Sequence, residues 1–172
     1  MMIHRLAPLL LLLTLTACGG GGGGGGTPQA GRYQVKVTVT KFDVPGLDAP
    51  RLNAMQRALV GKPTKYTYCL SDEAAGKKAE ALFAQTGEGT CKLHQFNPRG
   101  GKIDVLMTCR AISGRQSFAL KGVLNASSAQ FIADGVVDNR RFPRGRALIT
   151  REVSMKRIAD CTPPAVPGKK KG

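Results

Sequence analysis

The chain has few side chains suited to catalysis or to stacking on bases. Its 172 residues include no tryptophan, three tyrosines, six phenylalanines and two histidines. Only His94 lies beyond the first 17 residues, so a Ser-His-Asp or Cys-His catalytic unit would have to use it. No nucleophile motif of the Gly-x-Ser-x-Gly type accompanies this histidine. We therefore expect a structural histidine and a protein that is not an enzyme.

Acidic residues are also scarce. There are 11 Asp and Glu against 26 Lys and Arg, which gives a net charge of +15 at pH 7. Such a surface attracts polyanions and anionic lipid headgroups. The candidate anion-binding residues concentrate near the end of the chain: Arg140, Arg141, Arg144, Arg146 and Arg151. The competing interpretation is a solvated basic surface with no specific ligand.

The sequence favours anionic lipid, lipopolysaccharide or an anionic envelope polymer as partner over nucleic acid. Phe142 alone interrupts the arginine cluster, whereas a single-strand binder offers several stacking aromatics. The sequence does not identify a protein partner.

The longest apolar run, Leu6–Leu15, follows a positively charged Met1–Arg5 and is too short to span a bilayer as a helix. It ends in Leu15-Thr16-Ala17-Cys18, a lipobox pattern. We read residues 1–17 as a signal peptide and Cys18 as the lipidated first residue of the mature chain. The alternatives are an ordinary signal peptide with an incidental cysteine, and a short hydrophobic anchor.

Lipidation of Cys18 would hold the chain on a membrane, because each buried CH₂ of an acyl chain contributes about 0.8 kcal/mol. Gly19 stands where an Asp would resemble an inner-membrane retention signal. We therefore expect a periplasmic protein, and we expect its anchor to be in the outer membrane rather than in the inner membrane.

Residues 18–31 form a tether in this interpretation. Eight glycines, Gly19–Gly26, open it, and about 13 such residues reach roughly 20 Å as a flexible coil. Residues 32–161 form the folded domain. Residues 162–172, with three prolines and three terminal lysines, are expected to be a disordered basic tail.

The four remaining cysteines are an even number in an exported chain, which favours disulfides over metal thiolates. Two strand-like segments around Arg99-Gly100-Gly101 predict a hairpin centred on Gly100. This register places Cys91 opposite Cys109 and Leu93 opposite Met107, then Gln95 opposite Val105 and Asn97 opposite Ile103. His94 and Phe96 fall on the other face. The predicted bonds are Cys91–Cys109 and, by elimination, Cys69–Cys161.

The hydrophobic pattern predicts a mainly β (α+β) fold. We expect an antiparallel β meander or curved sheet of six to seven strands with two short helices and two disulfides. The strands outside the hairpin are expected at 32–42, 64–70, 116–124, 129–137 and 146–158, and the helices at 50–60 and 74–85.

Other clusters have ordinary explanations. Zinc on Cys91, His94 and Cys109 would need reduced thiols in an oxidising compartment. Asp72 and Glu73 suit a helix start. The three methionines that could bind Cu(I) lie in apolar patterns, at Met55, Met107 and Met155. No metal or cofactor is expected.

The motifs together resemble a family of small Gram-negative envelope lipoproteins catalogued only as a domain of unknown function. The resemblance covers about residues 31–161. Its most specific parts are Tyr66-Thr67-Tyr68-Cys69-Leu70, Met107-Thr108-Cys109 and Asp160-Cys161. Two residues depart from the family pattern, Tyr33 in place of Trp and Ala159 in place of Gly. The resemblance implies the envelope location and supplies no catalytic residues.

The sequence thus predicts a lipid-anchored periplasmic module with a non-catalytic binding or accessory role and a basic surface. One alternative is a carrier that holds a small apolar ligand in a curved sheet lined by Val35, Val37, Val105 and Phe118. The other is a periplasmic hydrolase with His94 in a polar cleft.

Overall fold

The computed structural model describes residues 27–76, 82–83, 89–112 and 114–161. Seven antiparallel strands in this part of the chain form one unclosed sheet, and two short helices accompany them. The predicted mainly β fold is confirmed. The elements in chain order are β1 (Gly31–Asp43), α1 (Ala49–Leu59), β2 (Pro63–Leu70), α2 (Asp72–Gly76), β3 (Thr90–Arg99), β4 (Lys102–Ala111), β5 (Gly114–Leu124), β6 (Ser128–Asp138) and β7 (Arg146–Ala159).

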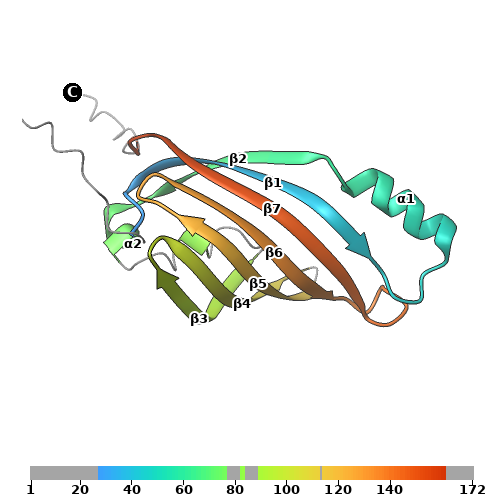
Figure 1. The fold of residues 1–172 in the computed structure, drawn as a ribbon. Coiled ribbons are helices and arrows are strands. Elements are labelled where there is room, and N and C mark those ends of the chain that lie inside the picture. The colour runs from blue at the N-terminus through green and yellow to red at the C-terminus, as the bar shows by residue number, and fades with distance from the viewer. Residues whose placement is uncertain (1–26, 77–81, 84–88, 113, 162–172) are drawn as a thin grey trace, which may run out of the picture.

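The strand order is β2-β1-β7-β6-β5-β4-β3. Strands β3 to β7 form the predicted meander, and the β1–β2 pair adds to its far side through β7 (Figure 1). Strands β2 and β3 are therefore the two edges, and the sheet stays open between them. No helix in the described residues is long and apolar enough to cross a membrane.

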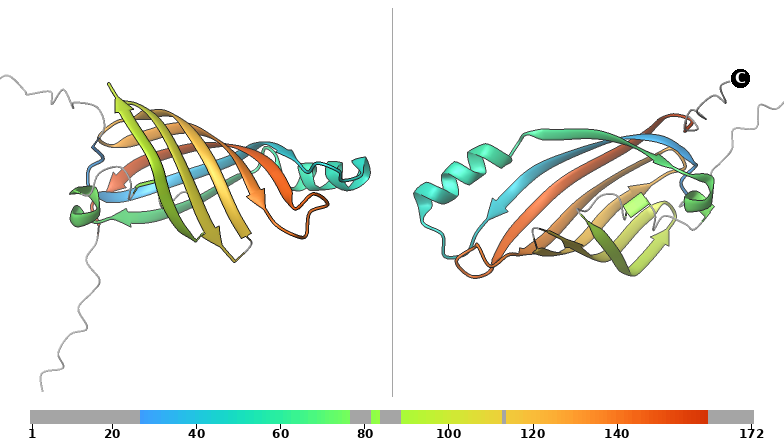
Figure 2. Two further views of the ribbon diagram at one scale, coloured as in Figure 1. Left: turned by 90° about the horizontal axis from the view of Figure 1, so that it is seen from below. Right: turned by 180° about the vertical axis from the view of Figure 1, so that it is seen from behind.

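The sheet bends so that one face is concave, and the hydrophobic core lies on this face (Figure 2). Strand β4 shows the two-residue period: Ile103, Val105, Met107 and Cys109 are buried while the residues between them are more exposed. Leu82 and Phe83 complete the core, and the ring of Phe83 lies 5.4 Å from that of Phe131. The expected second helix is described only at α2 and at 82–83, and its other residues lie outside the described part.

Two glycines of the sheet, Gly122 and Gly135, have no room for a side chain. A Cβ on Gly135 would come within 2.1 Å of the Phe118 ring, which lies over this glycine from the neighbouring strand. A Cβ on Gly122 would meet the backbone of β6 at Gln130. These close approaches require glycine because there is no room for a side chain.

The β3–β4 hairpin confirms half of the predicted register and corrects the other half. Cys91 faces Cys109 and Leu93 faces Met107, as expected. Beyond a bulge between Leu93 and Gln95 the pairing shifts, and Phe96 lies opposite Val105 on the core side. The turn is the two-residue Gly100-Gly101, both with positive φ, instead of the three-residue loop we expected. The bulge at His94 absorbs the one-residue difference.

Both predicted disulfides are present. Cys91–Cys109 joins directly opposed residues of β3 and β4, with Cα atoms 3.9 Å apart. Cys69–Cys161 joins β2 to the residues after β7, over a sequence separation of 92. Strand β1 lies between these two strands, so the second bond closes over the beginning of β1.

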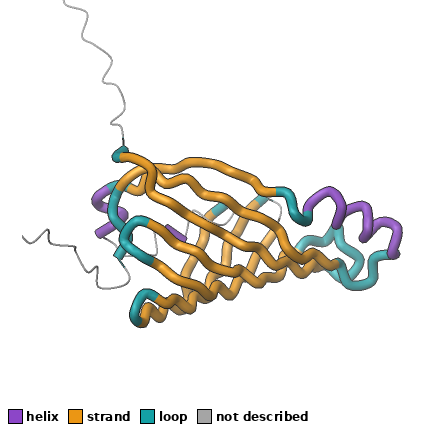
Figure 3. Tube along the Cα trace, turned by 45° about the horizontal axis from the view of Figure 1, so that its top comes forward, coloured by secondary structure: helices purple, strands orange, loops and turns teal. Residues whose placement is uncertain are grey.

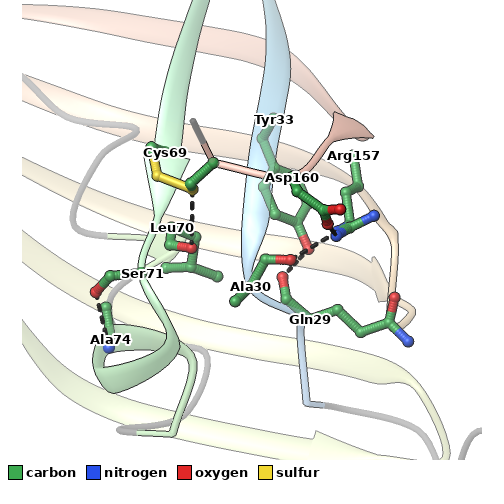
Figure 4. The surroundings of a disulfide bond; sticks show 10 residues. Gln29, Ala30, Tyr33, Cys69, Leu70, Ser71, Ala74, Arg157 and Asp160 are labelled. Carbon is green, nitrogen blue, oxygen red and sulfur yellow. Dashed lines mark hydrogen bonds and ion pairs between the residues drawn. A yellow bond between two sulfur atoms is a disulfide. The ribbon is translucent and has the colours of Figure 1, made fainter. Parts of the chain in front are cut away.

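The described chain enters and leaves at one end of the sheet (Figure 1). Here the Tyr33 hydroxyl donates to the Gln29 carbonyl at 2.7 Å, and Gln29 N donates to the Ala126 carbonyl. Arg157 Nε donates to the Ala30 carbonyl, and Arg157 also pairs with Asp160 (Figure 4). We call this the tether end. Helix α1 and the β6–β7 turn lie at the opposite, distal end (Figure 3).

Candidate functional site

The β6–β7 turn, residues 139–145, holds three of the predicted arginines at the distal end. Asn139 N donates to the Gly145 carbonyl at 2.8 Å, and the Asn139 side chain accepts from Arg141 N at 2.9 Å. Phe142 is half-buried against the core and anchors the turn. The side chains of Arg140, Arg141 and Arg144 are exposed around this anchor. The turn is therefore ordered and presents its charges to solvent.

Arg144 also connects the turn to the loop between β1 and α1. An atom added at the Cβ of Gly46 would meet Arg144 Nε at 3.3 Å and Cγ at 3.5 Å, so this side chain lies along the 44–48 loop. Leu47 of that loop packs against the core. The two loops thus form one continuous distal surface.

Sequence reasoning missed two arginines that extend this surface onto the sheet. The register places Arg110, Arg115, Asp138 and Arg146 in one row across β4, β5, β6 and β7. Arg110 and Arg115 face each other directly, and like charges in this position repel. Both residues lie beside the β4–β5 turn, Arg110 before it and Arg115 after it. Pairing residues outward from this turn on the sequence would have placed them opposite each other. We call Arg110, Arg115, Arg140, Arg141, Arg144 and Arg146 the arginine end.

Arg151 does not belong to the arginine end, although the sequence grouped it there. It lies five residues after Arg146, an odd spacing, so the two side chains point to opposite faces of β7. The Arg151 guanidinium lies 5.1 Å from the centre of the Phe118 ring on the core side. Its position indicates a packing role.

Three tyrosines, the only ones in the chain, share the concave face of β1 and β2. The rings of Tyr33 and Tyr68 stack with centroids 5.9 Å apart. Burial raises the pKa of Tyr33, Tyr66 and Tyr68, and the neighbouring phenols raise the pKa of Tyr68 further. Arg157 and Arg151 offset part of the rise in the pKa values of Tyr33 and Tyr66, respectively. All three phenols are therefore neutral at pH 7.

The residues proposed to line an apolar cavity are packed. Val35 and Val105 are 0 % exposed and Phe118 is 6 % exposed, and all three belong to one core cluster. Val37 is partly buried against the same cluster. These side chains therefore pack against one another in the core, and Phe118 also borders a depression of about 610 Å³ that includes Leu106 and Leu148.

His94 lies in the β3 bulge on an edge strand, exposed, with Nε2 3.0 Å from Thr108 Oγ1. Asp72 and Glu73 open α2, as expected for acidic residues at a helix start. Met107 and Met155 lie in the core, and Met55 is half-buried on α1. Among the described residues no group of three or more His, Cys, Asp or Glu side chains could hold a metal. Cys18 lies outside the described residues.

Comparison with known proteins adds the family. The family of proteins of unknown function DUF3617 matches residues 28–161. The chain belongs to this family. The DUF3617 match runs from the residues pinned at the tether end to Cys161 of the second disulfide. No curated protein and no solved structure matches the chain.

Proposed function

We propose that this DUF3617 protein is a lipid-anchored periplasmic module that binds an anionic envelope surface through its arginine end. The observation that carries the proposal is the row and turn of six arginines with a single carboxylate, Asp138, in the row. Among the described residues, none of these arginines forms an ion pair. The charge is therefore available to a partner. The role that we propose is binding, without catalysis.

Membrane anchoring rests on the lipobox at Cys18 and on the position of the tether. The described chain begins at Thr27, at the end of the body opposite the arginines. Strand β7 has 14 residues, which corresponds to about 45 Å between the two ends. The two disulfides support export, because such bonds persist in oxidising compartments such as the periplasm. Gly19 after the lipidated cysteine favours the outer membrane.

The partner that fits best is a phosphate-bearing lipid surface, such as lipopolysaccharide or acidic phospholipid. Arginine binds phosphate through paired N–H donors, and a basic residue near an anionic membrane contributes about 1 kcal/mol. Six arginines on one end can engage several headgroups at once, so binding should depend on salt.

The test is co-sedimentation of the full chain with vesicles that contain lipopolysaccharide or acidic phospholipid, at two salt concentrations. The variant Arg140→Gln/Arg141→Gln/Arg144→Gln should bind of the order of 100-fold more weakly, at about 1 kcal/mol for each residue. A control, Lys92→Gln/Arg99→Gln/Lys102→Gln, removes the same charge from other exposed positions. An equal loss in both variants would show that only net charge matters and would refute the proposal.

A further inference from the structure

A second set of cations lies on the outer, convex face of the sheet, away from the arginine end. The register places Lys65, Lys36, Ser154 and Gln130 in one row across β2, β1, β7 and β6. The adjacent row contains Gln34 directly opposite Lys156. These four strands lie side by side (Figure 1). Three lysines of three different strands thus meet on one small area.

The area is hollowed. A depression of about 510 Å³ is bordered by Lys36, Lys65, Lys156, Gln34, Gln130 and Ser154, and its lining contains no Asp or Glu. The ammonium groups are pure donors, and the amide and hydroxyl groups supply further donors. The lining of this depression therefore offers hydrogen-bond donors and positive charge, and a carboxylate, that of Glu152, lies in the adjoining hollow.

The lysines have no partner within the part of the chain that the structure describes. Lys36 and Lys65 are directly opposed, an arrangement in which like charges repel. None of the three forms an ion pair or a side-chain hydrogen bond with a described residue. Packing does not explain them either, because all three are exposed. A bound anion would relieve the repulsion.

A second hollow continues from the first and has a different character. It shares Lys36, Gln130 and Ser154 with the first, and Val123 and Ile132 add apolar surface to its lining. Its lining also contains one acidic residue, Glu152, and one further lysine, Lys121. Ile132 is 48 % exposed. A ligand that extends from the lysines into this hollow would carry a charged group and a less polar part.

We infer that Lys36, Lys65 and Lys156 form a binding site for a phosphomonoester group. Lysine binds phosphate as a point charge, and three ammonium groups more than neutralise a phosphomonoester, which carries nearly two negative charges. The phosphate can come from a lipid headgroup or from a soluble phosphate compound. The site lies in the half of the sheet next to the tether end: Gln34 and Lys36 are three and five residues after Gly31. This position, close to the proposed anchor, favours the lipid source.

The site shares no residue with the arginine end and does not require lipidation of Cys18. Failure of the proposed function and failure of this inference are therefore distinguishable, provided that the probes are small. A single phosphate group in solution does not reproduce the many contacts of a vesicle surface, so it reports on the lysine hollow.

The experiment titrates the full chain, in detergent, with three probes: dihexanoyl phosphatidic acid, inorganic phosphate and dihexanoyl phosphatidylcholine. Binding is followed by calorimetry and by the NMR signals of ¹³C-dimethylated lysines. We expect saturable binding of phosphatidic acid with shifts confined to three lysine signals. Phosphatidic acid binding at least tenfold tighter than phosphate assigns the lipid source, and equal affinity assigns a soluble phosphate compound. No saturable binding of either phosphate probe would overturn the inference.

The variant Lys36→Gln/Lys65→Gln/Lys156→Gln should lose at least tenfold in affinity for the phosphate probes. The matched control Lys62→Gln/Lys92→Gln/Lys102→Gln removes the same charge from exposed positions outside the hollow and should keep its affinity within about twofold. Equal losses in both would overturn the site. If a variant does not fold, the NMR shifts of the lysines in the unchanged chain still test the site. Shifts spread over all lysines would contradict the inference.

Discussion

Arg151 lies close in sequence to the residues of the arginine end, but its side chain packs on the core side of the sheet. Its guanidinium packs on Phe118, which in turn lies flat on Gly135. The two-residue period of a strand would have separated Arg151 from Arg146 on the sequence alone, because an odd spacing places them on opposite faces. The cation–π contact itself could not be foreseen, since it joins β5 and β7 across β6.

We predict that Arg151→Gln lowers the free energy of unfolding by about 0.5–2 kcal/mol, the range of a cation–π contact from exposed to desolvated sites. Urea denaturation measures this loss. The same variant should bind anionic vesicles within about twofold of the unchanged chain, since Arg151 lies apart from the arginine end. A loss of vesicle affinity comparable to that of the Arg140, Arg141 and Arg144 variant would contradict the assignment.

At the scale of elements, the local sequence pattern predicted where the strands lie. It did not predict which distant strands pair with each other. Alternation located β1 and β7 to within about one residue, and α1 begins where Asp48 caps Arg51 N. The hairpin register was right beside the disulfide and wrong beyond the bulge, because a bulge has no dependable sequence signature. The β1–β7 pairing, and with it the identity of the edge strands, joins segments more than 100 residues apart and could not be read from local pattern.

Strands β1 and β2 carry all three tyrosines. The ionisation of these tyrosines at high pH can therefore be followed by phenolate absorbance. The folded-state pKa values are raised above the ordinary value of 10, so stability is fully present below pH 10. It decreases as pH rises from 10 toward the raised folded-state values, since the unfolded chain loses its phenolic protons first. We predict that phenolate absorbance rises late and together with unfolding measured by circular dichroism.

The same titration in urea is the reference for this prediction, and there the tyrosines should ionise near pH 10. Because the chain lacks tryptophan, no other side chain obscures the signal. Ordinary ionisation near pH 10 in the folded protein would show that the tyrosines are not buried as described.

The two disulfides should differ in their effect on stability. Loop entropy predicts a contribution of about 4.6 kcal/mol for the bond spanning 92 residues, Cys69–Cys161, and about 3.2 kcal/mol for the bond spanning 18, Cys91–Cys109. We therefore expect Cys69→Ala/Cys161→Ala to lower the urea midpoint more than Cys91→Ala/Cys109→Ala. The reverse order would argue against the role of Cys69–Cys161 in holding the two ends of the domain together.

At the scale of the whole molecule, the distribution of charge follows from how the sheet is assembled. The sequence located the turn arginines but missed Arg110 and Arg115, because their place beside Arg146 depends on three successive strand registers. It also left open where the tether meets the body. The strand order shows where the described chain enters and leaves, since Gly31 and Ala159 begin and end the neighbouring strands β1 and β7 at the same end.

If the proposed lipid anchor is present at the tether end, the arginine end at the opposite side predicts that the molecule can join two membranes. With about 45 Å between its ends, the body holds the arginine end away from the bilayer that carries the anchor. A protein whose basic surface bound only the bilayer that holds its own anchor would not need this separation between its two ends.

The most direct measurement is light scattering from neutral vesicles that carry the full lipidated chain, mixed with anionic vesicles. The account predicts rapid clustering that high salt reverses. The variant Arg140→Gln/Arg141→Gln/Arg144→Gln should not cluster the vesicles, and Lys92→Gln/Arg99→Gln/Lys102→Gln should cluster them normally. Clustering that survives in the arginine variant, or no clustering with the unchanged chain, would contradict the claim that the arginine end binds an anionic surface.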